Sequence, residues 1–152
     1  MNKLLIIAIA ISTVMMASAP RSVAAEDGKG TLLVTAVGFK SSQGQAVVAV
    51  YRQGKGWLDL AKAFRIEKVP LDKLKDGSLR ITFRDLPHGE YAVTVLHDQN
   101  GNGRMDMRWL PYPKPEEPGG ASNNFIRSGK PEYSKAKFDF HRALMSVRIS
   151  LY

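Results

Sequence analysis

Residues 90–97 read Glu-Tyr-Ala-Val-Thr-Val-Leu-His, and this stretch decides the class of fold that we predict for the 152-residue chain. Successive side chains of a β-strand point to opposite faces of its sheet. Both alternating sets are largely apolar here: Tyr91, Val93 and Val95 on one face, and Ala92, Thr94 and Leu96 on the other. The pattern therefore predicts a central strand that is covered on both sides.

Further segments with strand character flank this one. Each is rich in Val, Ile, Thr, Phe or Tyr and is bounded by Gly, Pro, Asn or Asp. They are Thr31–Phe39, Gln45–Tyr51, Arg65–Val69, Ser78–Phe83, Lys137–Arg142 and Leu144–Leu151. Trp57–Phe64 predicts two helical turns, and Asp98–Lys135 contains no clear strand. About seven short strands without long helices predict an all-β, immunoglobulin-like antiparallel β-sandwich with one long irregular loop. A small open barrel is the alternative.

The first 25 residues have the layout of a secretory signal peptide. Lys3 precedes an apolar run from Leu4 to Met16, and small residues follow as far as Val23-Ala24-Ala25. The run is shorter than the roughly 20 apolar residues that a membrane-spanning helix needs. We therefore expect cleavage after Ala25 and a single β-sandwich domain over residues 26–152. We also expect a periplasmic or secreted location, with no membrane span after cleavage.

The composition excludes several classes of site. The chain has no cysteine, so disulfides, thiolate zinc sites, cysteine nucleophiles and an acylated lipoprotein anchor are all ruled out. No G-x-S-x-G motif supports an α/β-hydrolase. The formal net charge of +8 would attract anionic polymers of the cell envelope. Nucleic acid is not expected as a partner, because the aromatic residues do not form a stacking platform among the basic ones.

A loop with the spacing of a calcium site follows the central strand. Asp98, Asn100 and Asn102 stand at positions one, three and five, Gly103 at six and Asp106 at nine. Oxygen-bearing side chains on alternate residues converge inside a tight turn, and a glycine at six permits the sharp bend. The spacing therefore predicts a cation site, and calcium is the ion that we expect there.

The match to an EF-hand is incomplete. The backbone carbonyl of Arg104 fits position seven, but position twelve is Trp109 where an EF-hand has a bidentate Glu. Glu116, Glu117 or water would have to complete the site. Two loop carboxylates indicate weak binding, with a dissociation constant of about 10⁻⁴–10⁻³ M. The competing interpretation is a metal-free turn closed by Asx hydrogen bonds.

Several of these segments resemble the bacterial family known as domain of unknown function 2141. The resemblance rests on Leu86–Val95, on His97–Asp106, on Gly119–Asn124 and on the earlier Val37-Gly38-Phe39. It covers most of residues 30–152 and implies a secreted β-sandwich protein of uncharacterised role rather than a reaction. The chain departs from the family pattern at the proline-rich segment Leu110–Pro118, which is longer than its counterpart.

The leading hypothesis is a non-enzymatic module with a calcium-stabilised loop. Ion binding would order the long irregular segment and present a binding surface to a protein or glycan partner in the cell envelope. The residues expected on that surface are Trp109, Tyr112, Asn123, Asn124 and Phe125.

Two alternatives remain open. One is a metal-dependent envelope hydrolase that uses His97 with Asp98 and Asp106, and His141 as a further candidate, around a transition metal. The other is a basic accessory protein that binds anionic envelope polymers, with binding that weakens as the salt concentration rises.

Overall fold

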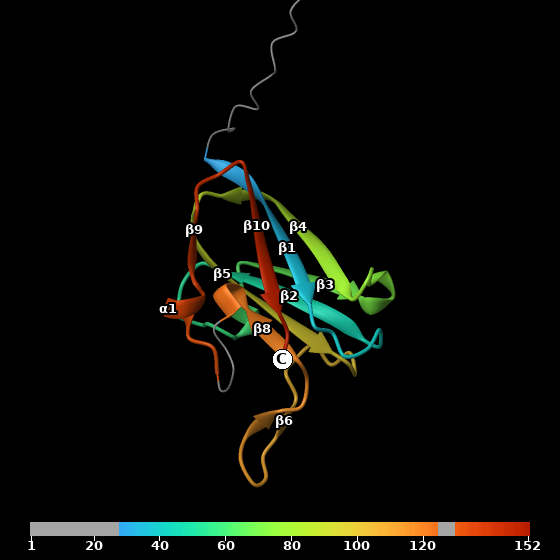
Figure 1. Cartoon of the computed structure of the whole chain (residues 1–152). Coiled ribbons are helices and arrows are strands. Elements are labelled where there is room, and N and C mark those ends of the chain that lie inside the picture. The colour runs from blue at the N-terminus through green and yellow to red at the C-terminus, as the bar shows by residue number, and fades with distance from the viewer. Residues whose placement is uncertain (1–27, 125–129) are drawn as a thin grey trace, which may run out of the picture.

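The computed structural model describes residues 28–124 and 130–152 and consists mostly of β-strands (Figure 1). The predicted signal peptide over residues 1–25 lies outside the described residues. The strands are β1 (Lys29–Val37), β2 (Gln45–Tyr51), β3 (Arg65–Pro70), β4 (Ser78–Pro87), β5 (Gly89–Asp98), β6 (Met107–Arg108), β7 (Lys114–Pro115), β8 (Gly119–Ala121), β9 (Phe138–Phe140) and β10 (Leu144–Ser150). The short helices are η1 (Leu60–Lys62), η2 (Leu71–Lys73), η3 (Ser122–Asn124) and α1 (Tyr133–Ala136).

The first sheet has the strand order β10–β1–β4. β1 pairs antiparallel with β4 and parallel with β10, where Val34 lies opposite Val147. The prediction of a wholly antiparallel sandwich is therefore wrong at this pair. Alternating apolar residues fix which face of a strand is buried but say nothing about strand direction. A parallel pair needs a long crossover, and here almost the whole domain connects its two strands.

The second sheet has the order β3–β2–β5–β8, and β9 pairs with the beginning of β5. All of its pairs are antiparallel. β5 is central, as the sequence predicts, and β2 occupies the predicted range Gln45–Tyr51. β8 was not predicted: it lies within the segment expected to be irregular and pairs Ala121 with Thr94.

The two sheets face each other across one hydrophobic core (Figure 1). Every second side chain of β1 and β4 enters this core and meets alternating side chains of β2 and β5. The buried set includes Leu32, Val34, Leu79, Ile81, Phe83, Val48, Val50, Tyr91, Val93 and Val95. Burying one such side chain completely contributes about 1.5–3 kcal/mol, so this alternation holds the two layers together.

The outer face of the second sheet is covered at one end by aromatic residues. The Trp57 ring packs edge-on against Tyr51 at 4.9 Å and against Tyr133 at 5.5 Å between ring centroids. Trp57 donates its indole N–H to the Pro131 carbonyl at 2.7 Å. The two helical turns predicted over Trp57–Phe64 are reduced to the three-residue η1, because Leu58 takes a positive φ of 67° that no helix accepts.

Candidate cation site and the adjoining hairpin

The predicted calcium loop begins at the last residue of β5 and leads directly into the β6–β7 hairpin. β6 starts one residue after Asp106, and the chain returns to the loop at Glu117, two residues after β7 ends. Figure 1 shows this hairpin extending away from the two sheets. The loop therefore lies at the point where the hairpin joins the sandwich.

Asp98 is completely buried at the start of the loop. Its Oδ2 accepts hydrogen bonds from the backbone N–H of Gly103 at 2.8 Å and from the Gln45 side-chain amide at 2.7 Å. Its Oδ1 is also buried and has no hydrogen-bond partner among the described residues. A buried polar atom left without a partner costs about 1–3 kcal/mol, and more when it is charged. A hard cation, which prefers oxygen ligands, would satisfy this atom.

Asn100 and Asn102 form two successive Asx turns. The Asn100 side-chain oxygen accepts a hydrogen bond from the N–H of Asn102 at 3.0 Å. The Asn102 side-chain oxygen accepts one from the N–H of Arg104 at 2.9 Å. These are the hydrogen bonds expected of the metal-free turn. Because an amide oxygen carries two lone pairs, each can keep its Asx turn and still coordinate a cation.

The carboxylate of Asp106 accepts hydrogen bonds from the amide nitrogens of both asparagines. Asn102 Nδ2 lies 2.9 and 3.0 Å from its two oxygens, and Asn100 Nδ2 donates to Oδ2. The side chains of Asn100, Asn102 and Asp106 are thus joined by direct hydrogen bonds, and Asp98 is tied to the same turn through the N–H of Gly103. The donor set of carboxylate and amide oxygens is the kind that calcium accepts.

Glu117 closes the loop from the far side of the hairpin. Its side chain is buried, with Oε1 accepting from the N–H of Gln99 at 2.8 Å and Oε2 from that of Asp106 at 3.2 Å. Glu116 is exposed and contributes its backbone N–H to the Asp106 carbonyl at 2.9 Å. Sequence spacing left these two acids as alternatives, and only Glu117 brings its carboxylate to the loop.

A basic residue from a neighbouring strand also lies beside the turn. The ammonium group of Lys68 on β3 lies beside Gly103, close enough to contact a methyl group at that position. Its positive charge disfavours a second cation in the loop. Spacing within the loop sequence cannot reveal this neighbour, since β3 precedes the loop by some thirty residues.

The structure does not bring His97 and His141 together, as the transition-metal hypothesis requires. His97 is buried, its Nε2 lies 3.0 Å from the Gln43 carbonyl, and its ring packs edge-on against Phe39. His141 lies instead beside His88, next to the opposite end of β5, roughly 30 Å along the strand from His97. In residues 28–124 and 130–152, no three His, Asp or Glu side chains form a group that could hold a metal ion.

The predicted binding surface divides into two places. Trp109 and Tyr112 are 69% and 78% exposed on the turn of the hairpin. Asn123 lies elsewhere, because it follows β8 and is therefore beside the middle of β5 rather than on the hairpin. Asn124 ends η3, and Phe125 lies outside the described residues.

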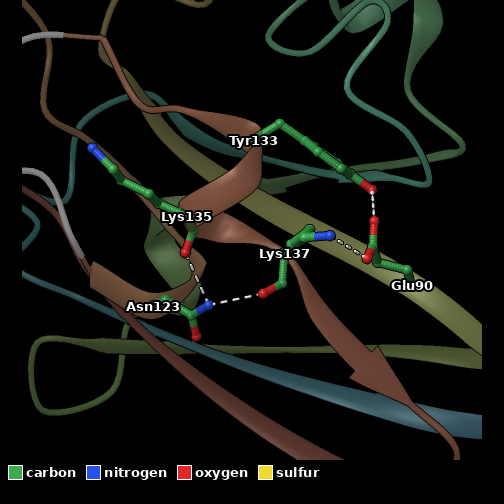
Figure 2. A network of polar contacts seen from close by, with 5 residues as sticks. All are labelled: Glu90, Asn123, Tyr133, Lys135 and Lys137. Carbon is green, nitrogen blue, oxygen red and sulfur yellow. Dashed lines mark hydrogen bonds and ion pairs between the residues drawn. The ribbon is translucent and has the colours of Figure 1, made fainter.

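Asn123 serves the packing of α1 (Figure 2). Its side-chain amide donates to the carbonyls of Lys135 at 3.1 Å and Lys137 at 2.9 Å. Lys137 in turn donates to Glu90 at 2.8 Å, and Tyr133 donates its hydroxyl to the same carboxylate at 3.3 Å. The hydrogen bond from Lys137 lowers the pKa of Glu90. Burial, followed by the Glu90 charge, raises the pKa of Tyr133 to about 12. This network fastens α1 to β5.

Comparison with known proteins places the chain in a family without giving it a function. No curated protein and no solved structure matches the sequence. Residues 34–148 match a family described as "Uncharacterized protein conserved in bacteria (DUF2141)". This match extends from the first strand to the last and includes the loop and the hairpin. The chain therefore belongs to the DUF2141 family, as its sequence motifs predict.

Proposed function

We propose that this protein is a secreted, non-enzymatic β-sandwich module of immunoglobulin-like type whose Asp98–Asp106 loop binds calcium. The signal peptide over residues 1–25 would deliver it to the periplasm or beyond. Two sheets packed on one core, with the loop at the end of β5, support this class of module. The proposed role of the ion is to hold the base of the β6–β7 hairpin and so present the hairpin to a partner in the envelope.

One observation carries the proposal: Oδ1 of Asp98 is a buried carboxylate oxygen without a hydrogen-bond partner among the described residues. Because Gly103 and Gln45 both engage Oδ2, the first residue of the loop keeps one oxygen for a ligand. Asn100, Asn102 and Asp106 would add side-chain oxygens, Arg104 its carbonyl, and calcium would supply the positive charge that these groups lack.

Calorimetric titration of the purified protein with calcium tests the proposal. We expect saturable binding in the weak range of about 10⁻⁴–10⁻³ M. Asp98→Asn keeps the shape of the side chain but removes its charge, and it should abolish the binding heat. Asp139→Asn removes an exposed acid on β9 and should leave the heat unchanged. Absence of heat from the unaltered protein at millimolar calcium would make the loop a metal-free Asx turn.

A further inference from the structure

The turn of the β6–β7 hairpin gathers exposed apolar residues. Met107 pairs with Pro115 and Arg108 with Lys114, which leaves residues 109–113 as the connection. Trp109, Leu110 and Tyr112 in this connection are 69%, 81% and 78% exposed. The other large apolar residues exposed in the described part of the chain do not form such a run: Phe64, Ile66, Leu144 and Tyr152. A concentrated apolar patch of this kind marks an interaction site.

The composition of this turn suits the interface of a lipid bilayer. Trp and Tyr have apolar rings with a polar group, and they concentrate where hydrocarbon meets water. Leu110 supplies a purely apolar side chain between them. Pro111 and Pro113 have no backbone N–H, so fewer hydrogen-bond donors have to leave water when the turn enters the headgroup layer.

Basic residues surround the base of the same hairpin. Lys40, Arg108 and Lys114, together with the single acid Glu116, line a shallow hollow there. Arg104 in the adjoining loop is also exposed. Among the described residues, none of the three cations that line the hollow forms a salt bridge. Cations positioned behind an apolar tip would meet anionic phosphate groups when the tip reaches the acyl boundary.

We infer that the β6–β7 hairpin docks this protein on the surface of an anionic lipid bilayer. Trp109, Leu110 and Tyr112 enter the interface, while Arg108, Lys114 and Lys40 contact the lipid phosphates. The tip protrudes from the sandwich (Figure 1), and a protruding apolar turn enters a soft bilayer without needing a matching groove. Apolar insertion and charge attraction add together, so the two features favour a membrane over a soluble polyanion.

Calcium would strengthen this docking through the base of the hairpin. The N–H of Glu116 donates to the Asp106 carbonyl, and the N–H of Asp106 donates to the Glu117 carboxylate. An ion in the loop would stabilise both hydrogen bonds and so restrict the tip of the hairpin to one orientation. Only this calcium dependence rests on the proposed function, because the apolar tip and its basic base are present without an ion.

The test is flotation of the purified protein with vesicles of mixed phosphatidylglycerol and phosphatidylcholine, compared with vesicles of phosphatidylcholine alone. We expect binding to the mixed vesicles only. Replacing the tip, with Trp109→Ser and Tyr112→Ser together, should reduce the partition coefficient about tenfold or more. The matched control Leu144→Ser with Tyr152→Ser alters two other largely exposed apolar residues, outside the hairpin, and should bind normally.

A second pair of variants tests the charges. Arg108→Gln with Lys114→Gln should weaken binding to the mixed vesicles. Lys29→Gln with Arg142→Gln is the matched control: it alters an exposed lysine and an exposed arginine near the start of β5, at the end of the sandwich away from the hairpin, and should not weaken binding. Equal flotation of the tip variant and the unaltered protein would overturn the inference. So would binding to dextran sulfate that matches vesicle binding and is unaffected by the tip substitutions, since the ligand would then be a polyanion.

The outcomes separate this inference from the calcium proposal. If the tip variants lose vesicle binding but still bind calcium in the calorimeter, both the docking inference and the calcium proposal are supported. Vesicle binding that persists unchanged in Asp98→Asn, while the tip variants fail, supports docking and removes only its dependence on calcium. Near-unchanged thermal unfolding of each variant would show that these exposed substitutions leave the fold intact.

Discussion

Asp98 and Gly103 are joined across the turn by a hydrogen bond of 2.8 Å from the backbone N–H of Gly103 to Oδ2 of Asp98. Gly103 adopts a φ of +77°, which directs its N–H into the loop at no steric cost to a glycine. The bond occupies one carboxylate oxygen and leaves Oδ1 without a partner among the described residues. The turn is thus closed by its own hydrogen bonds while one ligand atom remains available.

Glu117 should hold the base of the hairpin. Glu117→Gln replaces one carboxylate oxygen by an NH₂ group that cannot accept a hydrogen bond, so the half-buried N–H of either Gln99 or Asp106 loses its acceptor at a cost of about 1 kcal/mol. We expect trypsin to cut faster after Arg108 in this variant, as followed by mass spectrometry of the fragments. Glu116→Gln alters an exposed side chain and should be cut at the normal rate. Equal rates would show that Glu117 does not stabilise the hairpin.

The strands whose bounds the sequence predicts best are those with apolar side chains on both faces. β2 has the predicted bounds, and β5 extends the predicted segment by one residue at each end. These segments succeed because burial on two faces leaves a direct signature in residue type. β4 extends four residues beyond its predicted end, and β9 covers only Phe138–Phe140 of the predicted Lys137–Arg142.

What the sequence does not predict depends on contacts between distant segments. The parallel pairing of β1 with β10 is set by how the first and last strands meet, and no local pattern records it. In the site, the spacing of the loop identifies Asp98 and Asp106, but the choice of Glu117 over Glu116 is decided by the path of the hairpin. Gln45 and Lys68 reach the loop from β2 and β3, and nothing in the loop sequence points to them.

The two glycines of β8, Gly119 and Gly120, lead to a prediction about stability. Glycine is not a typical strand residue, and at Gly120 it is required because β10 packs too closely for a side chain. A Cβ on Gly120 would collide with the Ser150 carbonyl oxygen and the Ile149 side chain of β10. We therefore expect Gly120→Ala to lower the free energy of unfolding by about 1–3 kcal/mol, measured by urea denaturation. Gly119→Ala is the matched control: its nearest obstacle is the flexible end of Met105, and it should cost clearly less. Equal losses would contradict this account of the Gly-Gly pair.

The network of Figure 2 predicts a loss of stability at alkaline pH. The pKa of Tyr133 is raised from 10.0 to about 12, because burial and Glu90 both disfavour its phenolate. A raised pKa in the folded state gives stability that is complete below pH 10 and is lost as the pH rises towards 12. Tyr133→Phe keeps the packing on Trp57 and should flatten this part of the pH profile in urea unfolding. An unchanged slope between pH 10 and 12 would assign the loss to other groups.

The lowered pKa of Glu90 predicts a loss of stability at acid pH. Its pKa is lowered below 4.5 by the hydrogen bond from Lys137, so its contribution is present above that pH and is lost as the pH falls through the folded-state pKa. Glu90→Gln should therefore reduce the acid dependence of stability without changing its slope near neutral pH. Glu132→Gln, which alters the exposed partner of Lys135, is the matched control and should retain most of that dependence. Identical acid profiles for both variants would contradict the assignment.

The position of Lys68 beside the loop leads to a prediction about calcium affinity. Its ammonium group lies beside Gly103 and repels a cation in the loop. Because Lys68 is exposed, the repulsion is screened and should be worth about 0.2–1 kcal/mol, so Lys68→Met should raise calcium affinity by a factor of about 1.4 to 5. The gain should shrink as salt is added. Lys29→Met removes the same charge from the start of β1, opposite Pro87 and far from the loop, and should leave the affinity unchanged. If both variants bind calcium like the unaltered protein, Lys68 does not act on the ion, and the weakness of the site comes from its two loop carboxylates alone.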